Sequence, residues 1–182
     1  GLAHSALFYD LSATAWYARI ASLASAHPLG ELIMLDNELS QFSALAILIL
    51  RLFVGVIFIV HGWAKVDRRS QMGGMAGWGK ILGQMGIPAA AFFGYLNPLW
   101  ELIGGALIIA GLLTRFWAAG FVVIMLVAIF RAKIARGVVF WPRQPGQGGG
   151  WEFDFLILGV SLALVILDSG ALGLDRVLAL PI

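Results

Sequence analysis

Residues 97–115, NPLWELIGGALIIAGLLTR, form a stretch long and apolar enough to cross a bilayer, yet it contains a carboxylate at Glu101. On a helix, one stripe of this region, most of it small or polar, contains Gly94, Asn97, Glu101, Gly105, Ile108, Leu112 and Arg115. Because lipid offers a carboxylate no partner, this stripe is expected to face other helices rather than the bilayer.

A second stretch, RLFVGVIFIVHGWAK at residues 51–65, has a matching stripe of Arg51, Gly55, Phe58, Gly62 and Lys65. Glycines allow two helix backbones to approach closely, so the two stripes are predicted to pack together and enclose a buried polar site. Arg51 and Glu101 lie at similar depths in two antiparallel spans, and the sequence therefore predicts an ion pair between them. Such a pair could equally be purely structural and fix the helix register.

The composition defines the class of protein. The chain has 182 residues, of which 60% are hydrophobic and 12% are charged, with a net charge of +2. A soluble domain of this size needs far more polar surface, so the chain is expected to be an integral membrane protein in contact with the lipid bilayer. The basic residues adjoin apolar spans, which gives no support for nucleic-acid binding. The absence of cysteine excludes disulfides and thiolate metal sites in this chain.

Four apolar spans are predicted, at about residues 42–63, 90–113, 116–136 and 151–167. The third is strictly apolar only in its first part and must continue through the basic residues that end it. Between the first two spans, the spacing of Trp78, Ile81, Leu82 and Met85 predicts a short amphipathic helix. The predicted fold is an all-α membrane protein, a four-transmembrane-helix bundle with an N-terminal interfacial segment.

That N-terminal segment is assigned to residues 1–40, and the membrane domain to residues 41–182. The segment is mildly amphipathic, contains a predicted break at residues 27–30, and then becomes acidic before the first span. It is expected to lie on the membrane surface or to dock a partner chain.

Four spans place both long loops on one side of the membrane. That side has eight basic residues, against three on the other: Lys65, Arg68, Arg69, Lys80, Arg131, Lys133, Arg136 and Arg143, against Arg19, Arg115 and Arg176. Because short cytoplasmic loops are enriched in Lys and Arg, the long loops are predicted to be cytoplasmic and both termini external.

Three segments resemble one known family. RLFVGVIFIVHGWAKV, GIPAAAFFGYLNPLWELIGGALIIAGLLTR and the closing GALGLDRVL are similar to the DoxX/DoxD-like family of small four-helix membrane proteins, over about residues 50–178. The residues that carry the resemblance are Arg51, Gly62, Lys65, Glu101, Gly104, Gly105, Gly111, Thr114, Arg115, Glu152, Gly173 and Asp175. The resemblance implies a multi-pass protein of a prokaryotic inner membrane that works near respiratory or oxidative-stress chemistry. One branch of the family supplies the membrane subunit of a thiosulfate:quinone oxidoreductase.

Two classes of function follow. In the first, the chain is a subunit of a redox complex with a site for quinone or a similar lipophilic molecule. Arg51, His61 and Lys65 would donate hydrogen bonds to a carbonyl, Trp100 would line the pocket, and Glu101 would be the catalytic residue that exchanges a proton. The sequence has no fingerprint for a covalently bound cofactor and no cluster with metal-ligand spacing, so electrons would come from a partner subunit.

In the second class, the chain is a non-catalytic structural or assembly subunit of a larger membrane complex or of a homo-oligomer, and its polar core only specifies packing. A structure would discriminate between the two classes. The first requires a cavity that touches Glu101 and at least one of His61 and Lys65, between the first two spans and near the loop side. A tightly closed helix interface would favour the second.

Overall fold

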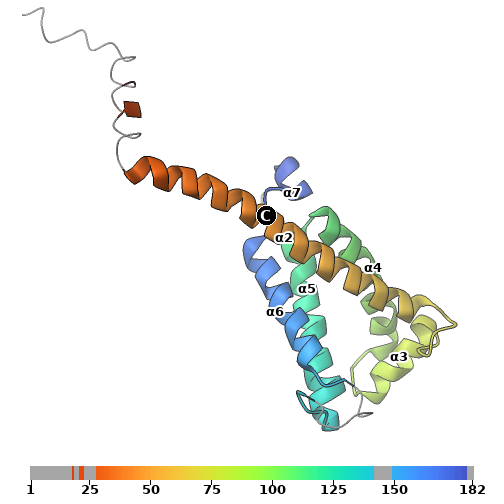
Figure 1. The fold of residues 1–182 in the computed structure, drawn as a ribbon. Helices are drawn as coiled ribbons and strands as arrows, with labels where there is room; N and C mark the ends of the chain where they lie inside the picture. Colours follow the sequence, from red (N-terminus) through yellow and green to blue (C-terminus); the bar gives the residue numbers. More distant parts are fainter. Residues whose placement is uncertain (1–17, 19–20, 23–27, 142–148, 180–182) are drawn as a thin grey trace, which may run out of the picture. The chain divides into compact units, whose positions relative to one another are not determined.

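The computed structural model describes residues 18, 21–22, 28–141 and 149–179. All the regular secondary structure of these residues is helical (Figure 1). The chain comprises two compact units, residues 1–43 and 44–182. Most of the first unit lies outside the described residues, and so does most of the predicted interfacial segment. Its role at the surface or in docking a partner stays a prediction.

The first long helix, α2, runs from Pro28 to Val66. A proline suits this position because the first turn of a helix needs no backbone N–H donor. The break predicted at residues 27–30 is wrong for residues 28–30, which belong to the helix. The helical pattern is continuous because the residues before the first span include no further proline or glycine after Gly30.

Three helical stretches are long and apolar enough to cross a membrane: Phe42–Val66, Ala90–Ala110 and Thr114–Arg136. They agree with the first three predicted spans. The third contains α5 (Thr114–Val127), a π-helical turn (Ala128–Lys133) and a 3-10 turn (Ile134–Arg136), so the predicted continuation through its basic residues is confirmed.

Shorter helices connect and complete the second unit. The predicted amphipathic helix between the first two spans is α3 (Gly74–Gln84), which packs against α4 (Ala90–Ala110). The fourth predicted span is the helix α6 (Glu152–Leu167), whose 16 residues are fewer than the ~20 of a typical span. The helix is present, and its crossing of the membrane stays a prediction. A short helix, α7 (Leu174–Val177), follows it.

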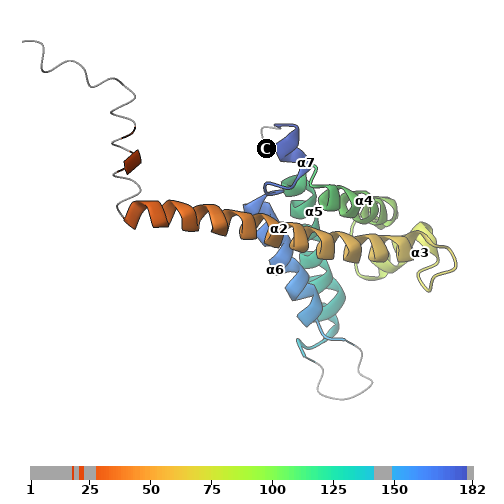
Figure 2. The ribbon, with the colours of Figure 1, turned by 45° about the horizontal axis from the view of Figure 1, so that its top comes forward.

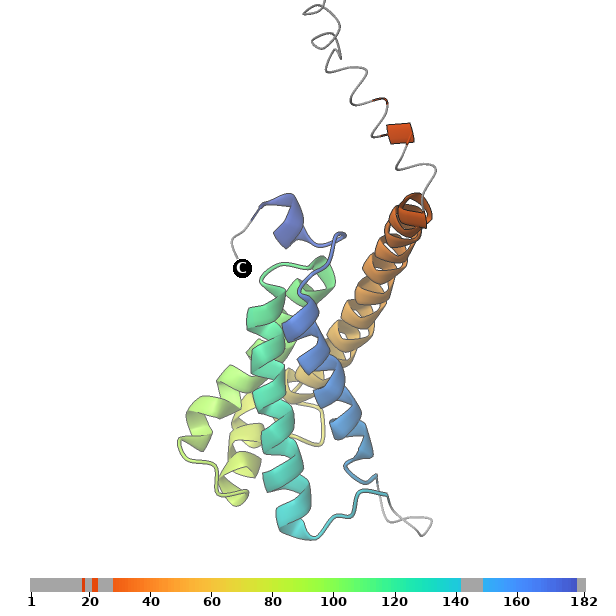
Figure 3. The same ribbon diagram turned by 90° about the vertical axis from the view of Figure 1, so that its left-hand side faces the viewer.

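The stripe predicted on the first span is buried, and it packs against the largely buried part of the stripe on the second span, from Gly94 to Ile108; Arg115, at the end of that stripe, is exposed. A Cβ added to Gly55 would come within 2.6 Å of the Gly105 carbonyl oxygen, and one added to Gly62 would lie 3.0 Å from the Glu101 Cβ. The two backbones are therefore in direct contact, as the glycine spacing predicts. Phe58, on the same stripe, stacks on Phe121 of α5. In Figures 1 and 3, α5 and α6 lie side by side.

Arg51 does not pair with Glu101, and the ion pair predicted between them is wrong. The guanidinium, 1% exposed, donates to three backbone carbonyls: Nε to Ile108 at 2.8 Å, Nη2 to Ile109 at 2.6 Å and Nη1 to Ser169 at 2.9 Å. The last carbonyls of a helix have no intrahelical donor, and the planar fork of Arg51 supplies donors to those of α4. Similar depth in two spans does not ensure pairing, because backbone carbonyls compete with carboxylates for a buried cation.

A second capping contact lies beside this one. The Asp175 carboxylate accepts from the backbone N–H groups of Leu113 at 2.7 Å and Thr114 at 3.1 Å, at the start of α5. Its own N–H donates to the Gly111 carbonyl at 2.8 Å. Figure 2 shows α7 beside the start of α5. Asp175 therefore caps the N-terminus of α5 from a distant part of the same chain. Its carboxylate accepts from N–H groups that have no acceptor within α5.

Candidate ligand-binding site

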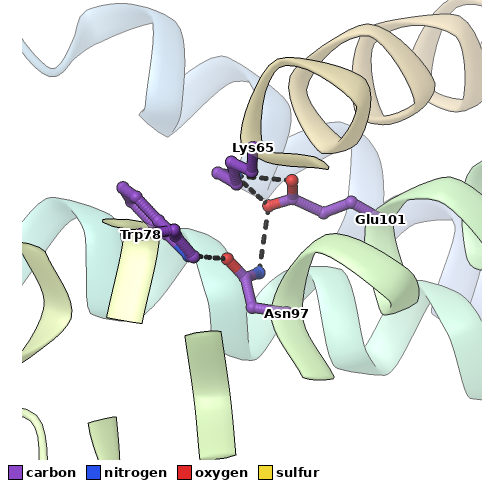
Figure 4. Close-up of polar contacts among 4 residues, drawn as sticks. All are labelled: Lys65, Trp78, Asn97 and Glu101. Atoms are coloured by element: carbon purple, nitrogen blue, oxygen red, sulfur yellow. Dashed lines mark hydrogen bonds and ion pairs between the residues drawn. The ribbon is translucent and has the colours of Figure 1, made fainter. Parts of the chain in front are cut away.

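A buried ion pair joins the first two spans. The Lys65 Nζ donates to both carboxylate oxygens of Glu101, at 2.5 Å each (Figure 4). The side chains are 9% and 1% exposed, so neither charge has substantial access to solvent. Two opposite charges in this position stabilise each other, whereas either one alone would be a costly unpaired ion. The ion pair is therefore the polar centre of the bundle.

Two further side chains extend the pair into a network. The Asn97 amide donates to Glu101 Oε1 at 3.0 Å, from one turn earlier on α4. Its carbonyl oxygen accepts from the Trp78 indole N–H at 2.8 Å, and the Trp78 ring lies 4.9 Å below the Lys65 ammonium. The α3 helix thus contributes a hydrogen bond and a cation–π contact to a charge pair held by α2 and α4. Figure 4 shows all four side chains converging.

This network forms one wall of a cavity of about 380 Å³. The other walls are predominantly apolar, with contributions from α2, α3, α4, α5, the π-helical turn and α6. The lining residues are Ile57, Phe58, His61, Lys65, Met72, Trp78, Leu82, Met85, Ile87, Phe93, Asn97, Glu101, Val123, Ile124, Met125, Val127, Ala128, Ala132, Phe153, Asp154 and Ile157. An apolar cavity of this size with a few convergent polar groups has the character of a small-molecule site.

The cavity lies near the ends of the spans that adjoin the long loops. Its α2 residues begin at Ile57, in the second half of the first span, and its α5 residues begin at Val123. Phe153 and Asp154 are at the start of α6, and the α3 residues belong to the connection between the first two spans. The π-helical turn widens the end of the third span at Ala128 and Ala132. Such turns often occur at functional sites.

The structure brings three of the five predicted site residues to this cavity and places two elsewhere. His61, Lys65 and Glu101 line it. Arg51 caps α4, as described above, and lies outside the cavity lining. Trp100 also lies outside it: its ring packs on Phe116 and Trp117, with centroids 5.0 and 4.6 Å away. Because Trp100 directly precedes Glu101 on the same helix, its side chain lies on a different face.

Three further residues contribute to the site, and their contacts are not among those predicted from the sequence. Asn97 was placed on the correct stripe, but its hydrogen bond to Glu101 was not predicted, although the i, i+4 spacing indicates it. Trp78 is predicted only as part of the amphipathic connecting helix, and nothing local shows that its indole reaches α4. Asp154 lines the cavity, although an acidic residue in the first turn of a helix is equally typical of a solvated charge. Only the packing of α6 against the other helices could reveal this.

The arrangement can bind a hydrogen-bond acceptor. A lysine ammonium has three N–H donors, and the two Glu101 oxygens leave at least one for a group in the cavity. The carboxylate holds the ammonium in place and balances its charge. His61, one turn earlier on α2, adds an imidazole at the same cavity.

The fold and this site define a class: a multi-helix membrane protein with a buried ion pair at the wall of an apolar cavity. The sequence comparisons specify the class further. A model of the DoxX family matches residues 46–134, which include Lys65, Asn97 and Glu101. The chain belongs to the DoxX family, and this confirms the resemblance inferred from the motifs.

Two curated relatives are each similar to more than half of the chain. A Bacillus subtilis (strain 168) protein named "Putative oxidoreductase CatD" is 35% identical over 128 residues, which cover 70% of this chain and 83% of that protein. A Mycobacterium tuberculosis (strain ATCC 25618 / H37Rv) protein named "Uncharacterized membrane protein Rv3486" is 35% identical over 107 residues, which cover 59% of each chain. No solved structure matches this chain.

Proposed function

We propose that this protein is the membrane subunit of a respiratory or oxidative-stress redox complex, and that its cavity binds a quinone or a similar lipophilic carbonyl compound. The observation that carries the proposal is the position of the Lys65–Glu101 pair at the wall of an otherwise apolar cavity. A ring with apolar substituents fits the walls, and its carbonyl oxygen fits the lysine donor. The name of the CatD relative supports a link to oxidoreductases.

In this proposal, each polar residue has a defined task. Lys65 donates a hydrogen bond from Nζ to the ligand's carbonyl oxygen, and Asn97 and Glu101 keep the ammonium oriented. Glu101 is also the residue proposed to hold or accept a proton, at the carboxylate bound to Lys65. A quinone, when bound, accepts electrons and protons at its carbonyl groups. The electrons come from a partner subunit, since this sequence offers no thiol relay of its own.

The proposal includes the membrane in which the protein works. Its setting is a prokaryotic inner membrane, with four spans and with the cavity at the cytoplasmic ends of the helices. The basic residues of both long loops support this orientation. The partner is a redox protein that approaches from the loop side, where the cavity lies.

A structural or assembly role is the alternative. The residues that favour it are those of the Arg51 cap and the Asp175 cap, which stabilise helix ends and do not reach the cavity. Both contacts belong to motif residues of the family. If the cavity holds only lipid chains, these packing contacts account for the motif without any ligand.

Binding of decylubiquinone to the full chain in lipid nanodiscs separates the two roles. Trp78 lies on the cavity wall, so a bound quinone should quench its fluorescence, and Trp78→Phe should lose that component. We expect Lys65→Gln and Glu101→Gln each to weaken binding about tenfold, because each removes one member of the charged pair. Lys80→Gln is the matched control, since Lys80 is exposed on α3 and does not line the cavity. If the unaltered chain gives no saturable quenching, the structural role is the better account.

A further inference from the structure

The cavity contains a second group of polar side chains, separate from the Lys65–Glu101 pair. His61 is one helical turn before Lys65 on α2, and Asp154 comes from the start of α6. The His61 ring lies nearly parallel to that of Phe153, with an interplanar angle of 20° and centroids 6.4 Å apart. His61 therefore faces the α6 wall, whereas Lys65 is bound to the α4 wall.

Asp154 is held differently from Glu101. Both Glu101 oxygens are within 2.5 Å of the Lys65 ammonium, and the side chain is 1% exposed. The Asp154 Oδ2 lies 3.8 Å from the Lys133 Nζ, beyond hydrogen-bond distance, and its side chain is 18% exposed. The same ammonium donates to the carbonyls of Gly149 and Gly150 at 3.2 Å each. Asp154 is thus a carboxylate of the cavity wall, and its nearest cation, Lys133, donates its hydrogen bonds to backbone carbonyls instead.

Four titratable or charged groups act at this position, and they come from three elements. His61 on α2, Lys133 at the end of the π-helical turn and Glu152 on α6 surround Asp154. His61 is exposed, and the start of α6 adjoins the long loop that ends at Gly150. An imidazole and a carboxylate at this boundary can both bind a proton and can both accept a hydrogen bond from a ligand.

We propose that His61 and Asp154 form a second polar end of the cavity, which binds the ligand's second hydrogen-bonding group and exchanges a proton with water on the loop side. This inference rests on the proposed function. His61 and Lys65 are one turn apart, about 5–6 Å between their Cβ atoms. The two oxygen atoms of a para-quinone or para-quinol face opposite ways across one ring, so such a molecule can reach both ends. The ligand class narrows to para-quinones and their quinols.

The pH should change the affinity of the cavity for a quinol in one direction. An ionised Asp154 and a neutral His61 both accept hydrogen bonds, so they favour the hydroxyl donors of a quinol. Protonation turns one Asp154 oxygen from an acceptor into a donor and removes the acceptor nitrogen of His61, so quinol affinity should fall as the pH decreases. The hydroxyls of decylubiquinol stay neutral as the pH decreases, so the change in affinity comes from the protein.

The test measures decylubiquinol bound to the full chain in nanodiscs, under anaerobic conditions, from about pH 5.5 to about pH 8. For the unaltered chain we expect affinity to fall at least about threefold across this range, and for Asp154→Asn to change by less than about 1.5-fold. Asp168→Asn is the matched control: its ion pair with Arg115 is also 3.8 Å long, and it does not line the cavity. Its pH profile should match that of the unaltered chain.

Each result bears on a different claim. If neither decylubiquinone nor decylubiquinol binds the unaltered chain, the proposed function fails and this inference falls with it. If both bind and Asp154→Asn keeps the normal pH profile, the second polar end is refuted while the proposed function stands. Should Asp154→Asn fail to fold, His61→Gln replaces it and must also flatten the profile. An unchanged profile in His61→Gln would equally refute the inference.

Discussion

Two buried cations of the first span have different tasks, and side-chain chemistry explains the division. Arg51 has a planar fork of donors and is bound to three carbonyls. Lys65 is a compact point charge and is bound to one carboxylate. A carbonyl-rich helix end suits the fork, whereas a single Glu101 side chain suits the ammonium. Arg51→Lys and Lys65→Arg should therefore each lower the stability of the protein, although both substitutions keep the positive charge.

The Lys65–Glu101 pair should appear as a coupled unit in stability measurements. Lys65→Met leaves a buried carboxylate unpaired, and we expect it to lower the free energy of unfolding by about 3 kcal/mol. Glu101→Gln should also destabilise the protein, and the double variant should cost less than the sum of the single ones. The measurement is equilibrium unfolding in detergent.

Arg51→Leu provides the comparison for that cycle. It removes donors from backbone carbonyls that do not contact Glu101, so its cost should add to that of Glu101→Gln. Additive behaviour of the Lys65 and Glu101 variants, or strong coupling between Arg51 and Glu101, would contradict the observed pairing. The latter result would restore the ion pair inferred from the sequence.

At the scale of elements, glycines determine how closely the helices pack. Gly55 and Gly105 bring α2 and α4 into backbone contact, and Gly94 does the same for α4 and α3, since a Cβ there would lie 2.6 Å from the Gly79 Cα. This close packing lets Lys65 reach Glu101 and Trp78 reach Asn97. The small residues thus position the polar network as well as the backbone.

Gly105→Ala tests this packing. The added Cβ would lie 2.7 Å from the Gly55 carbonyl oxygen, a backbone atom that cannot rotate away, so the helices must separate. We expect a loss of about 2 kcal/mol in the free energy of unfolding. Gly159→Ala on α6 is the matched control, because its Cβ would meet nothing within 4 Å and alanine favours a helix. Equal effects of the two substitutions on the melting temperature would reject close packing at Gly105.

At the scale of the whole membrane domain, the polar network, the cavity and the two long connections belong to the same ends of the helices. The first connection follows Val66, and the second follows Arg136. Whether α6 returns the chain across the bilayer decides on which face the residues after Leu167 lie. A 16-residue helix with an apolar sequence can do so only in a thin or locally adjusted bilayer.

Cysteine labelling tests the fourth span directly, because the sequence has no native thiol. Single cysteines at Gln71, Gly149 and Ala171 occupy exposed positions in the first connection, in the second connection and after α6. With four spans, the first two should react alike with an impermeant thiol reagent and the third oppositely. If cysteines at Gly149 and Ala171 react from the same side, α6 does not cross. Reaction of the first two from outside the cell would reverse only the orientation.

The sequence by itself determined the membrane class, the first three spans, the amphipathic connecting helix and the two stripes that pack together. These follow from composition and helical periodicity, which are local properties. The motif residues also indicated the family, and the match of the DoxX model to residues 46–134 confirms it. Lys65, Glu101 and His61 line one cavity, and all three are polar residues on or beside a small-residue stripe; their role in binding a ligand stays a prediction.

Only the tertiary structure decided which charges pair. Arg51 and Lys65 share a stripe, and periodicity places both against α4, but the relative shift of α2 and α4 along their axes determines which one meets Glu101. The π-helical turn and the arrival of Asp154 from α6 at the cavity likewise depend on contacts between elements remote in sequence. Helical periodicity specifies the face of a residue but not its neighbour on another helix, because that neighbour is fixed by the packing of the whole bundle.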